Sequence, residues 1–428
     1  MDAAGAIRAL SRVPLLGWLV GGFFAVALEI QVGTPLAHSL GLPKIPVLFG
    51  VVTALKKPWL FPGVAVYVLL IYALPIAVVA RLTAGLANWA AGRLLAFSLL
   101  VSAAVHLGLF YLTLEMWSGL SDYRDLVLRF TLIAVMVTLS LNVINGYMGE
   151  FSCSHPGFMA VGAYVASVLT IDLFTDHRVF GSALLPGALG PFLFPVILVI
   201  GGLAAAVSAL VVAVPSFRTR GDYLAIISLA FMFIIKSLIE NLEIVGGARG
   251  LGGQPDWAGL PAVFLWTVVC VWVINNFVRS TLGKALNAVR DNEMAATAMT
   301  VDTRYTKMVG FLFAAFWAGV AGGLFAHVLR YVNPGTFGIQ KLAEVLAMVY
   351  FGGLNSVYGS IIGAVGINLL GEALRPLEIF KWIIIPLLLI LVMIYRPTGL
   401  VAFREFDPET LLKPRTEPER ERDALPRG

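Results

Sequence analysis

The sequence predicts an all-α membrane protein that crosses the bilayer many times. Of its 428 residues, 59% are hydrophobic and only 13% are charged, and the mean hydropathy is +0.88. An average soluble domain is about 45–50% apolar and about 25% charged. A water-soluble chain could not cover so much apolar surface with polar groups. The composition therefore excludes a soluble enzyme and a disordered chain, and no dense basic patch indicates nucleic acid as a partner.

Apolar runs of about 20 residues predict the individual spans, because a helix of that length crosses the hydrocarbon core. Twelve is the central count, with ten or eleven as close alternatives, since several runs are short or interrupted by glycine. The segment 45–55 is too short to span. The runs lie near residues 14–33, 60–80, 93–116, 126–145, 157–174, 191–214, 224–243, 259–278, 308–331, 340–355, 357–374 and 380–396.

The first run, Val13–Leu28, also has features of a signal peptide. Arg8 and Arg12 precede it, and Ala25-Val26-Ala27 has the small residues of a cleavage site. We expect an uncleaved first helix instead, because the many spans that follow need no cleavable signal.

The distribution of basic residues predicts which loops lie on the cytoplasmic side of the membrane. Lys and Arg gather in the loops 81–93, 215–223 and 279–307, and such loops stay on the cytoplasmic side. This assignment also puts both termini in the cytoplasm. Lys44, Lys56 and Lys57 conflict with it, because they then lie outside.

The end of the chain differs in composition from the rest. Residues 404–428 hold 13 of the 55 charged side chains together with four prolines. Such a stretch cannot bury a core, so the sequence predicts a disordered cytoplasmic tail.

Motifs of catalysis are missing from the sequence. It contains no P-loop, no HExxH and no GxSxG. We therefore expect no catalytic residues, no metal site and no cofactor bound by this chain. The histidines and cysteines lack metal-ligand spacing and are His38, His106, His155, His177, His327, Cys153 and Cys270.

A glycine-rich stretch at 146–164 separates two apolar runs with polar groups and backbone breakers. Irregular backbone at membrane depth is enclosed by protein or lines a cavity, and transporters place substrate contacts there. The alternative is close helix packing through small residues. The candidate pathway residues are Gly149, Ser152, His155, Phe158, Gly162 and Tyr164.

A second stretch, 350–364, has the same character and adds Gly352, Gly353 and Asn355 as pathway candidates. Two broken segments, one in each half of the chain, are the pattern expected of inverted repeats around a pathway. A third glycine-rich stretch, 246–253, is either a flexible hairpin or a contact for an external partner.

Charged side chains inside spans are costly and need partners. Lys236 and Glu240 have the i, i+4 spacing of a pair along one helix. Glu344, Glu372 and Arg375 are similar, with the last two near helix ends. The alternative reading of these charges is the lining of an aqueous pathway, as in an ion-coupled carrier.

The loop 279–307 is too long for a minimal connection and is rich in helix formers. An exposed helix between spans suits docking into the groove of a partner. The alternative is an interfacial helix without a partner.

This loop resembles the coupling region of ABC importer permeases, in which Glu293-Met-Ala295-Ala296 matches the "EAA" signature. Arg290-Asp-Asn292 before it resembles the LivM-type permeases of branched-chain amino acid importers. The stretch 146–164 is similar to another motif of that family. Further ordered matches are 220–230, 246–253, 351–356 and 396–400.

The resemblance covers residues 126–402. It implies a permease core at 126–403, with additional transmembrane helices at 1–125 as in the longer members. The chain departs from the family at four positions. Thr300 replaces a glycine, Ser154 replaces a glycine, Pro156 is unusual and Glu150 stands where glutamine is common.

The resemblance also implies partners. They are a second, homologous permease, two cytoplasmic ATPase subunits that use ATP, an extracytoplasmic substrate-binding protein and the lipid of a bacterial inner membrane. The residues that would contact the ATPases are Arg290, Asn292, Glu293, Ala295 and Ala296. The alternatives are a urea or other small-solute permease of the same superfamily, an ion-coupled secondary transporter and a purely structural subunit.

Overall fold

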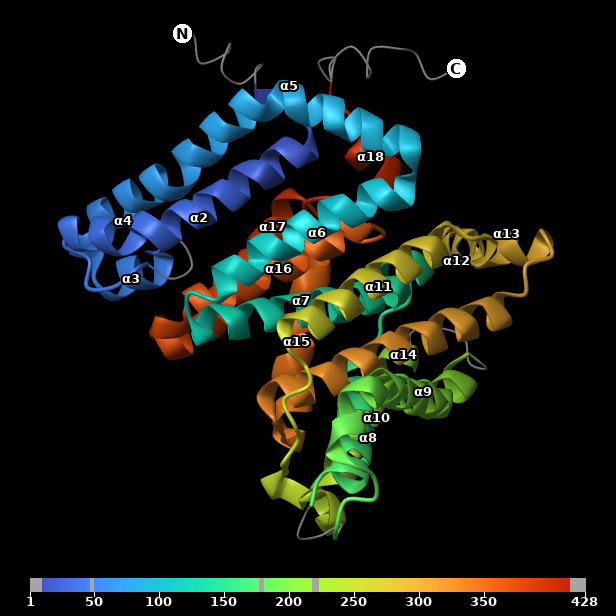
Figure 1. Ribbon diagram of the computed structural model, residues 1–428. Coiled ribbons are helices and arrows are strands. Elements are labelled where there is room, and N and C mark those ends of the chain that lie inside the picture. The colour runs from blue at the N-terminus through green and yellow to red at the C-terminus, as the bar shows by residue number, and fades with distance from the viewer. Residues whose placement is uncertain (1–9, 47–49, 177–180, 218–222, 416–428) are drawn as a thin grey trace. The chain divides into compact units, whose positions relative to one another are not determined.

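The computed structural model describes residues 10–46, 50–176, 181–217 and 223–415, and most of them are helical (Figure 1). The chain forms two compact units. The first comprises Met1–Asp125, Glu372–Glu378 and Asp407–Gly428, and the second comprises Leu126–Gly371 and Ile379–Phe406.

In the first unit, the long helix α2 packs against α5 and α6. Gly21 of α2 allows this approach, since a Cβ there would lie 2.9 Å from the carbonyl oxygen of Ile76. The helices of this unit are α2 (Leu15–Ser39), α3 (Val51–Lys56), η2 (Pro58–Leu60), α4 (Phe61–Val68), the π-helical turn η3 (Leu69–Ala73), α5 (Leu74–Phe97), α6 (Leu99–Ser118) and α18 (Pro408–Leu412). Three helices have residues in both units, namely α7 (Asp122–Asn142), α16 (Val357–Ala373) and η9 (Arg375–Phe380).

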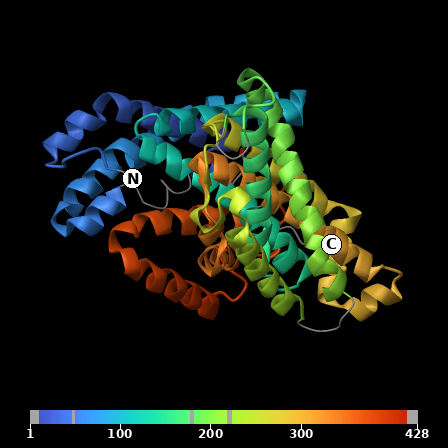
Figure 2. The ribbon, with the colours of Figure 1, turned by 90° about the horizontal axis from the view of Figure 1, so that it is seen from below.

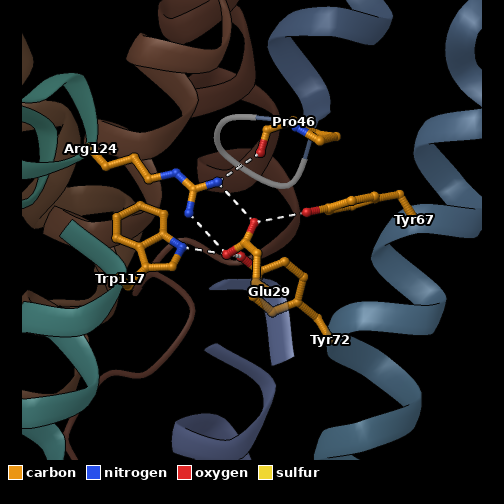
Figure 3. A network of polar contacts seen from close by, with 6 residues as sticks. All are labelled: Glu29, Pro46, Tyr67, Tyr72, Trp117 and Arg124. Atoms are coloured by element: carbon orange, nitrogen blue, oxygen red, sulfur yellow. Dashed lines mark hydrogen bonds and ion pairs between the residues drawn. The ribbon is translucent and has the colours of Figure 1, made fainter. Parts of the chain in front are cut away.

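A buried ion pair holds the first unit together (Figure 3). Arg124 Nη1 and Nη2 each donate to one carboxylate oxygen of Glu29, both at 2.9 Å. Tyr67 donates to the same carboxylate at 3.2 Å, and the hydroxyl of Tyr72 also donates to it. Both charges are almost fully buried, so only this hydrogen-bonded pairing makes their burial tolerable.

Two further contacts complete the network. Trp117 Nε1 donates to the Tyr72 hydroxyl at 3.2 Å, and Arg124 Nη2 donates to the carbonyl oxygen of Pro46 at 3.2 Å. The network therefore connects α2, α4, η3, α6 and the first turn of α7.

Removing the arginine tests the importance of this pair. We expect Arg124→Met to lower the free energy of unfolding by about 3–5 kcal/mol, because Glu29 is left buried without its cation. The control, Arg375→Met, removes a 3.6 Å pair with Glu372 in which the arginine is exposed, and should cost less than about 1 kcal/mol. Denaturant unfolding in detergent micelles measures both, and equal losses would contradict the account.

The second unit is built around three helices, since α14 packs against α8 and α9, and these two pack against each other (Figures 1 and 2). Its helices are the π-helical turn η4 (Val143–Met148), α8 (His155–Phe174), η5 (Gly187–Leu189), α9 (Gly190–Ser216), α10 (Tyr223–Asn241), η6 (Glu243–Val245), η7 (Gly247–Arg249), α11 (Leu260–Arg279), α12 (Thr281–Asp291), α13 (Glu293–Ala298), α14 (Thr303–Leu329), η8 (Pro334–Phe337), α15 (Ile339–Gly352) and α17 (Lys381–Tyr395). Strands β1 (Leu251–Gly252) and β2 (Tyr331–Val332) pair antiparallel, Leu251 opposite Val332.

Within the described residues, nine helices are long and apolar enough to cross a membrane, fewer than the ten to twelve predicted. Each of the twelve predicted runs does form a helix. The last three, α15, α16 and α17, have only 14, 17 and 15 residues. The glycines at 352 and 353 end α15 early, which explains part of the difference. The chain is an all-α polytopic membrane protein.

Two of the charged groups that the sequence analysis singled out pair along their own helices, as one of the two interpretations predicted, whereas Glu29 and Arg124 pair between helices. Lys236 lies 3.7 Å from Glu240, and Lys341 lies 3.2 Å from Glu344. The ionic contact between Arg375 and Glu372 lies at the end of α16.

Two expectations are corrected. Part of the tail predicted to be disordered is helical, since Asp407 caps α18 and Leu412 of that helix is buried. Residues 416–428 lie outside the described residues, as do Arg8, His177 and the predicted cytoplasmic residues Arg218 and Arg220. The stretch 246–253 is not a self-contained hairpin, since its strand β1 pairs with β2 after α14.

Candidate functional site

The loop 279–307 forms two short helices, α12 and α13, as its composition predicted. Ser280 Oγ accepts from the backbone N–H of Gly283 at the start of α12. Asn292 is extended, with φ −162°, and its side-chain oxygen accepts from the N–H of Ala295 at 3.0 Å. Asn292 therefore separates the two helices and caps the second, the role that Asn commonly has at a helix start.

Helix α13 presents most of its surface to the outside. Glu293, Met294 and Ala295 are exposed, and Met294 retains 82% of its accessible surface. Ala296 alone among the predicted contact residues of α13 is buried, and it anchors the helix. The exposed side of α13 is therefore accessible, and Ala296 is its structural support.

Thr300 ends α13 in a conformation that favours glycine. Its φ is 66°, in the left-handed region. The N–H of Thr300 donates to Thr297 O, and the N–H of Val301 donates to Ala296 O, both at 3.1 Å. These are the two hydrogen bonds of a Schellman motif, in which the left-handed residue is usually glycine. This left-handed conformation explains why the family that the chain resembles has glycine where this chain has Thr300.

We expect Thr300→Gly to stabilise α13 by about 1 kcal/mol, because the Cβ of a β-branched residue is strained at this φ. Thr300→Ala keeps a Cβ and should gain much less. Amide hydrogen exchange over residues 293–301 measures the local stability. Equal protection in the two variants would contradict the explanation.

Arg290 connects α12 to the break at the end of α7. Its Nη1 donates to the carbonyl oxygen of Gly146 at 3.2 Å, while Nε and Nη2 hold Asp291 Oδ1 at 3.0 and 2.7 Å. Its stem covers Gly149, where a Cβ would lie 2.3 Å from Arg290 Cγ. Gly149 also has φ +76°, so both space and backbone conformation require glycine here.

The second glycine-rich stretch is joined to the end of the family-like region. The N–H of Leu400 donates to Phe351 O at 3.1 Å, and that of Val401 donates to Gly352 O at 2.9 Å. Leu354 N–H donates to Thr398 O at 3.3 Å. Two segments that matched the family separately, 351–356 and 396–400, therefore form one turn structure.

Asn142 connects the two broken segments. Its side-chain N–H groups lie 3.2 Å from Gly353 O, 3.1 Å from Ser356 O and 2.6 Å from Ser360 Oγ. Its Oδ1 accepts from the N–H of Asn355 at 3.1 Å. Because the Asn142 side chain is buried away from water, the polar groups of the turn depend on it for these hydrogen bonds.

We name the assembly of residues 146–150, 290, 351–356 and 398–403 the coupling junction. The predicted residues Gly149, Arg290, Gly352, Gly353 and Asn355 meet in it. Asn142, which holds it together, was not predicted, because nothing in the local sequence marks one asparagine in an apolar helix.

We expect Asn142→Leu to lower the free energy of unfolding by about 3 kcal/mol, since several buried polar groups lose their partner. Asn368→Leu is the matched control. Asn368 makes a single bond, to Thr131 Oγ1 at 2.6 Å, so its loss should cost about 1 kcal/mol. Denaturant unfolding in micelles compares them, and the hypothesis is wrong if Asn368→Leu costs as much.

Other predicted pathway residues lie elsewhere. Gly162 is where α8 meets α14, and a Cβ there would lie 2.1 Å from Gly319 O. Tyr164 donates to Val332 O at 3.4 Å, beside the strand pair. For Gly162, the geometry favours the packing interpretation over a pathway role.

Ser152, His155 and Phe158 are buried at the start of α8. The backbone N–H of Ser152 donates to Asn145 Oδ1 at 3.3 Å, so this segment is fixed to η4. Phe158 packs against Phe231 and Phe311, with ring centroids 5.2 and 5.6 Å apart. None of the three is open to solvent in this conformation.

Nearby, burial raises the pKa of the Cys153 thiol above its ordinary value. Among the described residues, no three His, Cys, Asp or Glu side chains gather as a metal would need.

Comparison with known proteins identifies the family of the chain. The family described as "Branched-chain amino acid transport system / permease component" matches residues 123–394, more than half of the chain. The chain belongs to this permease family. The matched residues include both broken segments and α12–α13.

Curated permeases of branched-chain amino acid transport systems are similar to more than half of the chain. The high-affinity branched-chain amino acid transport system permease protein LivM of Escherichia coli K12 is 31% identical over 306 residues, 63% of this chain and 68% of that protein. The LivM protein of Salmonella typhimurium is 30% identical over the same shares. The probable permease LivH of Methanocaldococcus jannaschii is 26% identical, over 57% of this chain and 76% of that protein. No solved structure matches the chain significantly.

Proposed function

We propose that the chain is a permease subunit of an ATP-driven importer that moves branched-chain or related amino acids into the cytoplasm. The observation that carries this proposal is the direct contact between α12 and the broken end of α7 through Arg290 and Gly146. It gives a force on the exposed α12–α13 surface a short route to the irregular backbone that follows the apolar span Asp122–Met148.

The partners follow from the same proposal. Two ATPase subunits would bind the exposed side of α13 and use ATP, so that this chain needs no cofactor. A second, homologous permease would complete the pathway, and an extracytoplasmic binding protein would deliver the amino acid. The membrane would be the bacterial inner membrane, with both termini of the chain in the cytoplasm.

Transport would then be the control of two conformations. ATP binding can favour one of them only if the ATPases contact α12–α13 differently in each. The outward- and inward-facing states would differ in how the coupling junction lies relative to α8, which begins six residues after Gly149.

The competing functions lose part of their basis. Lys236 and Glu240, the charges that suggested an ion-coupled carrier, are paired on one helix. The similar proteins are named for branched-chain amino acid transport, which favours these amino acids over urea as the substrate class.

Substitution on the exposed side of α13 tests the coupling. We expect Ala295→Arg to reduce ATP-driven leucine uptake by at least about tenfold, because the added side chain would hinder docking of the ATPase. A change of about tenfold lies in the usual range of coupling between two sites. The control is Thr336→Arg, an exposed position in η8, which follows the opposite end of α14. Uptake is measured in proteoliposomes that contain the complete complex.

Two results would contradict the proposal. One is normal uptake by Ala295→Arg. The other is leucine uptake by this chain alone, driven by an ion gradient without ATP, which would support the carrier instead.

A further inference from the structure

We propose that Lys307 is a positioning residue that transmits the position of the coupling helix α13 to the broken segment after α7. The inference rests on the proposed function and identifies the contact by which that function would operate. Neither the sequence motifs nor the similarity to known permeases assigns a role to Lys307.

The Lys307 ammonium bridges two carboxylates from separate parts of the chain. Its Nζ lies 2.7 Å from Glu150 Oε1 and 3.0 Å from Glu293 Oε2. Glu150 directly follows Gly149, where the helical part of α7 and η4 has ended. Glu293 is the first residue of α13. One cation therefore connects the broken segment, the coupling helix and α14.

Lys307 has a fixed place from which to make this bridge. It lies one turn into α14, whose start is capped by Asp302, since Asp302 Oδ1 accepts from the N–H of Tyr305 at 2.9 Å. Helix α14 is also the helix that packs against both α8 and α9. Lys307 thus belongs to the rigid centre of its unit, while α13 lies at its exposed edge.

The two arms of the bridge differ in exposure. The Lys307 side chain is 12% exposed and that of Glu150 is 26% exposed, whereas that of Glu293 is 51% exposed. The arm to Glu150 is therefore screened less by water and salt. When α13 moves, the weaker arm to Glu293 breaks first, and the ammonium, with three donors on a flexible stem, stays with Glu150.

A second contact binds the same segment. Arg290 of α12 holds Gly146 O at 3.2 Å, so residues 146–150 are attached to α12 near one end and, through Lys307, to α14 at the other. A movement of α12 and α13 together must then either carry this segment along or release it. Such a choice between two discrete arrangements is what transmission between distant sites requires.

The charge of Glu150 makes the inner arm an ion pair. A glutamine at this position would leave the Lys307 ammonium without an opposite charge on the broken segment.

The test measures leucine transported per ATP hydrolysed in the complex reconstituted with its ATPase subunits. We expect Lys307→Met to lower this ratio by about tenfold, in the usual range of coupling between two sites, while the ATPases still co-purify in normal amounts. Lys307→Arg should retain most of the ratio. The control is Lys341→Met, which breaks a lysine pair confined to one helix and should leave the ratio unchanged.

Exchanging the charges of Lys307 and Glu150 distinguishes loss of the ion pair from misfolding. Lys307→Glu alone places three carboxylates together and should transport least. Adding Glu150→Lys restores the inner arm, so the double variant should recover part of the ratio. An unchanged ratio in Lys307→Met, or a double variant no better than Lys307→Glu, would overturn the inference.

Failure of the inference is distinguishable from failure of the proposed function. If the unmodified complex transports leucine without hydrolysing ATP, the function itself is wrong. If the unmodified complex is coupled and Lys307→Met is coupled equally well, only the role of Lys307 is wrong.

Discussion

Where a helix breaks inside a folded chain, backbone N–H and C=O groups lose their helical partners, and the buried ones must find others within the protein. This constraint determines the coupling junction. The end of α7 and the turn between α15 and α16 are both irregular, and the side chain of Asn142 serves the turn from within α7. Because that side chain is buried, the two irregular segments are held as one piece. The coupling helices then need to contact only one of them to influence both.

Glycine has two roles in this chain that local sequence does not separate. At Gly149 and Gly353, glycine allows a positive φ where no space remains for a side chain. Arg290 fills the space beside Gly149, and the backbone of Val401 fills the space beside Gly353. At Gly162 it lets α8 approach α14 closely, which is how helices associate without a hydrophobic driving force between them. The distinction depends on the neighbouring backbone and appears only in the folded chain.

Much of the fold could be predicted from composition and periodicity. Each apolar run forms a helix, and the polar, alanine-rich loop forms α12 and α13. Thr300 was noted only as a departure from the family that the chain resembles, and its left-handed φ of 66° appears only in the structure. The two residues that join the site, Asn142 and Lys307, could not be predicted. Along the sequence, Asn142 lies 211 positions from its partner Gly353, and Lys307 lies 157 positions from its partner Glu150. A single sequence contains no sign of such pairings.

The central claim is that the coupling helices and the broken segments change conformation together. Amide hydrogen exchange in the reconstituted complex, with and without ATP bound under conditions that prevent hydrolysis, tests it most directly. The account predicts that exchange in residues 281–298 and in residues 146–154 changes on addition of nucleotide, and that the turn at 351–356 follows. A change confined to residues 281–298, with 146–154 unaffected, would contradict it.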